Sequence, residues 1–464
     1  MRSKKEKKRK RGIRMNQFKG EKNLLSEKKE RFSSAGFIFA AIGSSVGLGN
    51  MWKFPYITGE NGGAAFFLLF IVCLVLIGLP VLLAELAIGR SGRGSAATAF
   101  VRAGGGKNWM AVGFLQVLAP FLILSFYIIV AGWTLNYAMI AFNGQLFSSS
   151  NYAGEFSSFI SGPMPIVWQG IAILITAGVV ILGVSGGIEK FNKVLIPGLV
   201  VLLIVLMIRA VTLPGANEGV AFFLKPDFSV LTAESALVAL GHAFFSLSLG
   251  MGILLTYGSY VDKKQSLGTA ALAVGAGDLL YAFIAGLIIF PTTFSFGIAP
   301  DQGPSLIFIA LPAAFSAMPF GAFFGGLFFI LLAIAALTSA VSLLEVPVSF
   351  AMERWNWSRK RSVWILSLVC FLLSIPSAMS LGMVPELSFG GKALFDWVDF
   401  VTSNIMLPLG GLLVTIFAGY FWKGAAEAAG LKAGWFRVWL FMLRYVAPIL
   451  VFLVLLHTSG IIKF

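Results

Sequence analysis

The sequence predicts an all-α integral membrane protein with eleven transmembrane helices. Of its 464 residues, 58% are hydrophobic and only 12% are charged, whereas about a quarter of the residues in a soluble domain are charged. Apolar stretches of about 20 residues, the length that a helix needs to cross a bilayer, recur along the chain. Lys and Arg also concentrate in alternate loops between these stretches. This composition excludes a soluble enzyme.

The apolar stretches define the predicted spans in chain order. They cover residues 35–57, 63–89, 109–143, 163–183, 191–211, 233–258, 266–297, 321–353, 362–380, 394–420 and 438–458. Because Lys and Arg favour cytoplasmic loops, their distribution puts the N-terminus in the cytoplasm. An odd number of spans then puts the C-terminus outside the cell.

Residues 1–32 form a basic tail before the first span. Residues 1–31 contain 14 Lys and Arg and 4 Asp and Glu. Such a tail suggests nucleic-acid binding only when a soluble domain follows it, and here membrane spans follow. We therefore expect a cytoplasmic tail that obeys the positive-inside rule, with contact to anionic lipid as an open alternative. Met15 is an alternative start of the chain.

Two spans are interrupted near the middle of the membrane. Residues 43–50 of the first span read GSSVGLGN, and residues 244–252 of the sixth read FFSLSLGMG. Glycine inside a helix costs about 1 kcal/mol relative to alanine, and unwound backbone at membrane depth is tolerated only where it lines a protected cavity. Interruptions at matching positions of two halves indicate a transporter's binding site. Glycine for close helix packing is the alternative.

The first interruption belongs to a longer motif, GSSVGLGNMWKFPYITGENGGAAF at residues 43–66. This motif resembles the first-helix signature of the neurotransmitter:sodium symporters, which have the leucine-transporter fold. Further matches follow in order: GLPVLLAELAIGRSGRG at 78–94, AFFSLSLGMGILLTYGSYV at 243–261 and ALTSAVSLLE at 336–345. The chain looks most like bacterial members that take up hydrophobic L-amino acids.

The resemblance implies a transporter domain at residues 33–458 built from two inverted five-helix repeats. Helices 1–5 occupy residues 33–212 and helices 6–10 occupy residues 233–420, with helices 1 and 6 interrupted. Helix 11 follows at 438–458, and residues 459–464 form an extracellular C-terminus.

A substrate site is expected at the two interruptions. An amino acid keeps a carboxylate and an ammonium group, and each needs polar partners inside the membrane. Free backbone N–H groups at the first interruption suit the carboxylate, and carbonyl groups from both interruptions suit the ammonium group. The resemblance assigns to this site Ser45, Leu48, Gly49, Ile123, Tyr127, Phe245, Ser246, Ser248, Met251, Ser339 and Leu343.

The resemblance also implies two co-transported sodium ions, which as hard cations bind oxygen ligands. The first site comprises Ser45, Asn50, Ser246 and Asp278 with the substrate carboxylate. The second comprises Gly43, Val46, Ala335, Thr338 and Ser339. Hydroxyl groups that simply bond back to their own helix are the alternative reading of the Thr-Ser pair.

Asp278 differs from the Asn that is commonest in the family at this position. Animal members balance charge with chloride near the first sodium site, and the corresponding ligand position here is Ala282. A carboxylate in the sodium site supplies the negative charge from the protein itself. We therefore expect transport that is independent of chloride.

The resemblance also implies two gates. The outer gate comprises Lys53 and Asp399 above an aromatic lid of Tyr127 and Phe245. The cytoplasmic gate comprises Tyr260, Glu345 and Glu353, with Lys28 as the expected basic partner. His242 replaces a Gln near the outer gate, where we favour a hydrogen-bonded structural role over a proton relay.

These features predict sodium-coupled secondary active uptake of neutral hydrophobic L-amino acids, aliphatic and aromatic, across the plasma membrane by alternating access. A symporter of the same fold for another small zwitterionic or amine substrate is the alternative. A channel would show a pore-lining repeat instead of gates on both sides of one site. A sensor would carry a long soluble output domain, and an enzyme would show a nucleophile–base pair or a metal set. We expect no nucleic-acid partner, and the oligomeric state stays open.

Overall fold

The computed structural model of the chain describes residues 31–148, 151–299, 306–458 and 461. Within these ranges the protein is almost wholly helical, which confirms the predicted fold class. The only strands there, β1 (Ser388–Phe389) and β2 (Lys392–Ala393), form a short antiparallel hairpin. Lys28 and nearly all of the basic tail lie outside the described residues.

The first half of the chain forms helices that follow the first five predicted spans. They are α2 (Ser34–Ser45), η1 (Gly49–Lys53) and α3 (Phe54–Glu60); α4 (Ala64–Cys73), η2 (Leu74–Gly78) and α5 (Leu79–Gly92); α7 (Trp109–Phe142); α9 (Met164–Ile181); and η4 (Val184–Ile188) with α10 (Glu189–Val211). Shorter helices connect them: α6 (Ala96–Arg102), η3 (Gln145–Ser148), α8 (Tyr152–Ile160), α11 (Ala216–Leu224) and η5 (Phe228–Val230).

The second half follows the remaining six predicted spans. They are α12 (Ala233–Ser246) and α13 (Ile253–Ser259); α14 (Leu267–Ser295); α16 (Gly321–Trp355); α17 (Arg359–Met379); α18 (Leu394–Asp399), η8 (Phe400–Met406), α19 (Leu407–Ile416) and η9 (Phe417–Phe421); and α21 (Ala433–Phe441), η10 (Met442–Val446) and α22 (Ala447–Thr458). The connecting helices are η6 (Leu306–Ala310), α15 (Leu311–Ala317), η7 (Pro385–Leu387) and α20 (Ala425–Ala429).

The predicted count of eleven spans is not confirmed by helix length and composition. In the described part of the chain, nine helices are long and apolar enough to cross a membrane. A tenth span results if Ser34–Ser45 and Gly49–Glu60, which bend by 41°, count as one. The predicted sixth span corresponds to α12 and α13, which have 14 and 7 residues and are separated by residues 247–252. Each is too short to cross the bilayer alone.

Both predicted interruptions are present. The first helix stops after Ser45, and Val46 adopts an extended conformation with ψ 92°. In the second interruption Ser248, Gly250 and Gly252 have φ values of 57°, 76° and 69°. Glycine adopts this left-handed region without strain. Three left-handed residues within five positions are incompatible with a right-handed helix, so the helix ends there.

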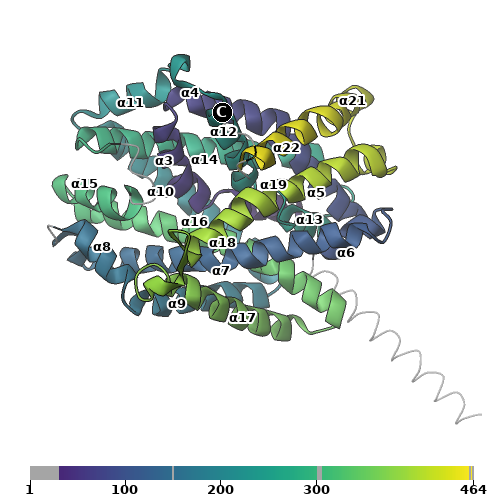
Figure 1. Cartoon of the computed structure of the whole chain (residues 1–464), viewed down its shortest axis with the longest axis horizontal. Helices are drawn as coiled ribbons and strands as arrows, with labels where there is room; N and C mark the ends of the chain where they lie inside the picture. Colours follow the sequence, from purple (N-terminus) through teal and green to yellow (C-terminus); the bar gives the residue numbers. More distant parts are fainter. Residues whose placement is uncertain (1–30, 149–150, 300–305, 459–460, 462–464) are drawn as a thin grey trace, which may run out of the picture.

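The interrupted helices lie at the centre of the molecule. Helix α2 packs against α10, α14 and α16, and α16 packs along α7; Figure 1 shows α16 and α7 running side by side through the middle of the fold. The apolar window of α16 is 83% buried inside the protein. A helix enclosed in this way is apolar on all sides, and its few hydroxyl groups stand out as candidates for a site.

The broken sixth span makes a test of topology possible. If α12 and α13 together cross the membrane, the segments before and after them lie on opposite sides. Alkaline phosphatase fused after Ser229 should be active, and green fluorescent protein fused after Lys263 should be fluorescent. The reciprocal fusions serve as controls, because each reporter works in one compartment only. Reporters that place both junctions in the same compartment would contradict a sixth span.

Candidate functional site

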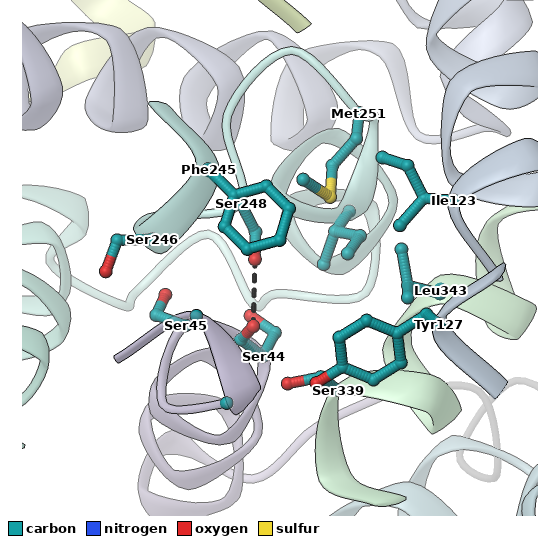
Figure 2. A pocket seen from close by; sticks show the side chains of 13 residues that line it. Ser44, Ser45, Ile123, Tyr127, Phe245, Ser246, Ser248, Met251, Ser339 and Leu343 are labelled. Carbon is teal, nitrogen blue, oxygen red and sulfur yellow. Dashed lines mark hydrogen bonds between the residues drawn. The ribbon is translucent and has the colours of Figure 1, made fainter. Parts of the chain in front are cut away.

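A small cavity lies between the two interruptions and helices α7 and α16. The space between its lining atoms is about 360 Å³, part of which is open to solvent. Figure 2 shows serine hydroxyl groups gathered near the end of α2, with Met251, Ile123 and Leu343 on the other side. The residues that line it are Ser44, Ser45, Gly47, Gly49, Ile123, Tyr127, Phe245, Ser246, Ser248, Met251, Ile253, Ser339 and Leu343.

Most residues predicted for the substrate site therefore line one cavity. Sequence reasoning missed Ser44, Gly47 and Ile253, although all three lie within or beside the interrupted segments. Ser44 also links the two interruptions, because the Ser248 hydroxyl donates a hydrogen bond to the Ser44 carbonyl at 2.8 Å (Figure 2).

Tyr127 contacts the first interruption directly. The Leu48 N–H donates to the Tyr127 hydroxyl oxygen at 3.2 Å. From the sequence we expected this amide to be free, and it is not. The phenolic hydrogen of Tyr127 remains able to donate to a carboxylate. A Cβ on Gly47 would lie 2.4 Å from Ser339 Oγ and 3.1 Å from the Tyr127 hydroxyl oxygen. Glycine at 47 therefore lets both side chains approach the backbone closely.

Three residues of the predicted first sodium site come together. Asp278 Oδ1 accepts hydrogen bonds from Asn50 Nδ2 at 2.8 Å and from Ser246 Oγ at 2.7 Å. Asp278 Oδ2 and Asn50 Oδ1 are buried and have no hydrogen-bond partner among the described residues. Two buried acceptor oxygens without donors are costly. A cation would stabilise both, so this oxygen set fits a sodium ion.

The structure at the second predicted sodium site is compatible with sodium ligands and also with hydroxyl groups that bond only to their own helix. The Thr338 hydroxyl donates to the Ile334 and Ala335 carbonyl oxygens at 3.1 and 3.0 Å, as expected of a hydroxyl that bonds back to its own helix. The hydroxyl oxygen nevertheless keeps acceptor capacity for a cation. Ser339, next to Thr338, lines the cavity.

The predicted outer gate residues also meet. Lys53 Nζ lies 3.7 Å from Asp399 Oδ2 and 4.8 Å from the centre of the Phe245 ring. The Ser403 hydroxyl donates to Asp399 Oδ1 at 2.6 Å. Both charged side chains are partly exposed, and an ion pair of this kind contributes about 0–1 kcal/mol. It can therefore form and break readily.

His242 corrects one expectation. Its ring lies 5.6 Å from that of Phe54 and 5.3 Å from that of Phe70, measured between centroids. Neither nitrogen has a hydrogen-bond partner within the described ranges. The hydrogen-bonded role favoured from the sequence is therefore wrong, and His242 packs between aromatic rings instead.

On the opposite side of the cavity, Glu345 has a basic partner that the sequence did not reveal. The Tyr260 hydroxyl donates to Glu345 Oε1 at 2.7 Å, as expected for two gate residues. Arg359 at the start of α17 binds both carboxylate oxygens of Glu345, at 2.7 and 3.0 Å. The sequence pattern did not single out Arg359, and the expected partner, Lys28, lies outside the described residues.

Glu353 belongs to a different cluster from Tyr260 and Glu345. Its carboxylate pairs with Arg102 and accepts hydrogen bonds from the Ser95 N–H at 2.6 Å and the Thr98 hydroxyl at 3.0 Å. These partners come from α6 and the residue before it. Glu353 thus fixes the C-terminal end of α16 to the connection between the second and third spans.

Two further carboxylates hold the interrupted helices and were not predicted. Glu85 Oε1 accepts from the Gly250 N–H at 2.8 Å, which satisfies an amide of the second interruption. Glu189 accepts from the Ser33 N–H at 2.9 Å and the Ser33 hydroxyl at 2.6 Å, at the start of α2. The segment around Glu85 matched the family motif, but nothing in the sequence indicated its partner.

Comparison with known proteins gives consistent results. A profile described as "Sodium:neurotransmitter symporter family" matches residues 29–156 and 153–464. A sodium-dependent transporter of Bacillus subtilis is 39% identical over 95% of this chain and 100% of its own length. The sodium-dependent serotonin transporter of Drosophila melanogaster is 27% identical, over 89% of this chain and 74% of its own. A crystal structure of MhsT in complex with L-phenylalanine superposes with a TM-score of 0.87 at 46% identity, covering 92% of this chain and 99% of that one.

The Glu345–Arg359 pair can be tested by changing Arg359→Gln. Glu345 is fully buried, and removing one partner of a buried ion pair costs about 3–5 kcal/mol. Arg359→Gln should therefore unfold in detergent at a clearly lower temperature than the wild type. Lys360→Gln, at the exposed neighbouring position, is the matched control. The double variant Arg359→Gln with Glu345→Gln should recover much of the lost melting temperature, because it leaves no unpaired charge. Equal melting temperatures for Arg359→Gln and Lys360→Gln would show that the pair does not stabilise the fold.

Proposed function

We propose that this chain, which belongs to the Sodium:neurotransmitter symporter family, takes up neutral hydrophobic L-amino acids. It is a multi-pass membrane protein of a family of transporters, and its relatives transport in a sodium-dependent way. Sodium is accordingly the co-transported ion, and a small molecule is the substrate. The class of that molecule, the number of ions, the plasma membrane location and the orientation of the termini are our proposals.

The cavity lining is the observation that carries the substrate proposal. Its side-chain end is formed by Ile123, Met251, Ile253 and Leu343, and no lining residue is charged. Burial of apolar surface stabilises a complex by about 25 cal/mol per Å², whereas an ionised side chain would lose its hydration without a partner. Neutral aliphatic and aromatic side chains therefore fit this end better than charged ones.

The other end of the cavity suits a zwitterion. The Tyr127 hydroxyl can donate to a carboxylate, and the serine hydroxyl and carbonyl oxygens around Ser44 and Ser248 can accept from an ammonium group. An amine without a carboxylate would leave the Tyr127 donor unused. This favours an amino acid over an amine, and L-phenylalanine bound to MhsT favours it over another small zwitterionic substrate.

An alternating-access cycle is supported by the side-chain contacts that close the site on each side. In the proposed cycle, Lys53 and Asp399 separate to admit substrate and sodium from outside. The contacts of Glu345 with Tyr260 and Arg359 then open to release them into the cytoplasm. Two sodium ions bind in this proposal. One lies at Ser45, Asn50, Ser246 and Asp278, and the other at Thr338, Ser339 and the carbonyl groups of Gly43, Val46 and Ala335.

Sodium-driven uptake without chloride is the experiment that tests the function. Labelled leucine should accumulate in proteoliposomes only with an inward sodium gradient, and replacing chloride by gluconate should leave the rate unchanged because Asp278 supplies the negative charge. Asp278→Asn should lower uptake by about tenfold or more, since it removes a charged ligand of the ion. Asp262→Asn, in an exposed loop, is the control. Uptake that ignores the sodium gradient would overturn the proposal, and uptake that stops in gluconate would overturn its chloride argument.

The substrate range depends on Met251, whose flexible thioether can withdraw for a large ring or fill space beside a small side chain. We expect unlabelled tryptophan, phenylalanine, leucine, isoleucine and valine all to compete with labelled leucine. Met251→Phe should weaken competition by tryptophan most, because a second rigid ring occupies the same volume. Competition curves for the wild type and the variant measure this. A wild type that tryptophan does not inhibit would exclude a broad pocket.

A further inference from the structure

The backbone on both sides of Met251 is packed against neighbouring helices. A Cβ on Gly250 would lie 2.2 Å from the Leu407 carbonyl oxygen in α19. A Cβ on Gly252 would lie 2.4 Å from the Gln116 carbonyl oxygen in α7. No side chain fits at such distances, so residues 250–252 are held backbone to backbone between α7 and α19.

Gln116 connects these two helices beside the packed segment. Its fully buried side chain donates from Nε2 to the Gly410 carbonyl oxygen at 3.1 Å. Gly410 itself touches the segment, because a Cβ there would lie 2.4 Å from the Gly250 carbonyl oxygen and 3.1 Å from Gln116 Nε2. The amide of Gln116 thus fixes the spacing of α7 and α19 at the place where the segment packs.

The same segment presents a side chain to the substrate cavity. Met251 is 3% exposed and lines the cavity together with Ile123 and Tyr127. Gln116 lies seven residues before Ile123 and eleven before Tyr127, which puts all three on one face of α7. The backbone of Met251 can therefore move away from a bulky substrate only as far as the packing against α7 and α19 allows.

We propose that Gln116 and Gly410 are positioning residues that set the largest substrate side chain the site accepts. They act through the backbone of residues 250–252 and do not line the cavity themselves. Tighter packing of residues 250–252 against α7 and α19 pushes Met251 into the cavity and excludes substrates with large side chains. Looser packing lets Met251 withdraw and favours substrates with large side chains. This inference rests on the proposed function, because it presupposes amino-acid substrates.

Gly410→Ala tests the tightening. The added methyl group meets the Gly250 carbonyl, so the half-inhibitory concentration of tryptophan should rise relative to that of leucine by about tenfold, the effect of one methylene group in an apolar pocket. Gly178→Ala in α9 is the matched control, since a Cβ there meets nothing within 4 Å. The sodium concentration for half-maximal uptake should not change, because the contacts of Asp278 are untouched.

Gln116→Met tests the effect of looser packing, and it tests the inference independently if Gly410→Ala does not fold. Methionine keeps the volume of the side chain but removes the hydrogen bond to α19, so the tryptophan-to-leucine ratio should fall by about threefold. Gln116→Glu, protonated when buried, can still donate and should restore the wild-type ratio. A Gln116→Met variant in which both substrates shift by the same factor, or neither shifts, overturns the inference. A wild type without sodium-dependent amino-acid uptake overturns the proposed function and this inference with it.

Discussion

One buried carboxylate joins both interrupted helices to the rest of the protein. Asp278 on α14 accepts hydrogen bonds from Asn50 in the first interruption and from Ser246 at the end of α12. A carboxylate without a neutralising partner is costly at this depth, and its second oxygen has no donor in the described part of the chain. A sodium ion bound there would neutralise the carboxylate and link the two interruptions at once. Ion binding at this site would therefore be coupled to the arrangement of the substrate cavity through a single side chain.

The interruptions impose a second requirement, because backbone groups inside a membrane must find partners within the protein. Glu85 accepts from the Gly250 amide, and the Leu48 amide donates to Tyr127. The Ser44 carbonyl accepts from Ser248. Each of these contacts also shapes the cavity or holds a residue that lines it. The polar groups released by breaking two helices thus become the polar groups of the site.

The sequence predicted features that depend on local pattern and missed those that depend on packing. Glycine-rich stretches located both interruptions, because φ values such as those of Gly250 and Gly252 suit glycine. The resemblance to the symporter family brought Asn50 and Asp278 into one predicted site. The sequence did not reveal Arg359 as a partner of Glu345, since Arg359 reaches it only through the way α17 packs against α16. For the same reason, the contacts of Glu85 with Gly250 and of Glu353 with Arg102 could not be read from spacing along the chain.

The two sides of the site differ in how strongly they are closed. The Lys53–Asp399 pair is 3.7 Å long and partly exposed, so breaking it costs about 0–1 kcal/mol. On the other side, Arg359 binds both oxygens of the fully buried Glu345, and separating such a pair without compensation costs about 3–5 kcal/mol. In the proposed orientation the extracellular side therefore opens more readily than the cytoplasmic side. An empty transporter with this bias would stay open to the side where sodium is abundant. Cytoplasmic opening would then depend on energy released when the ions and substrate bind.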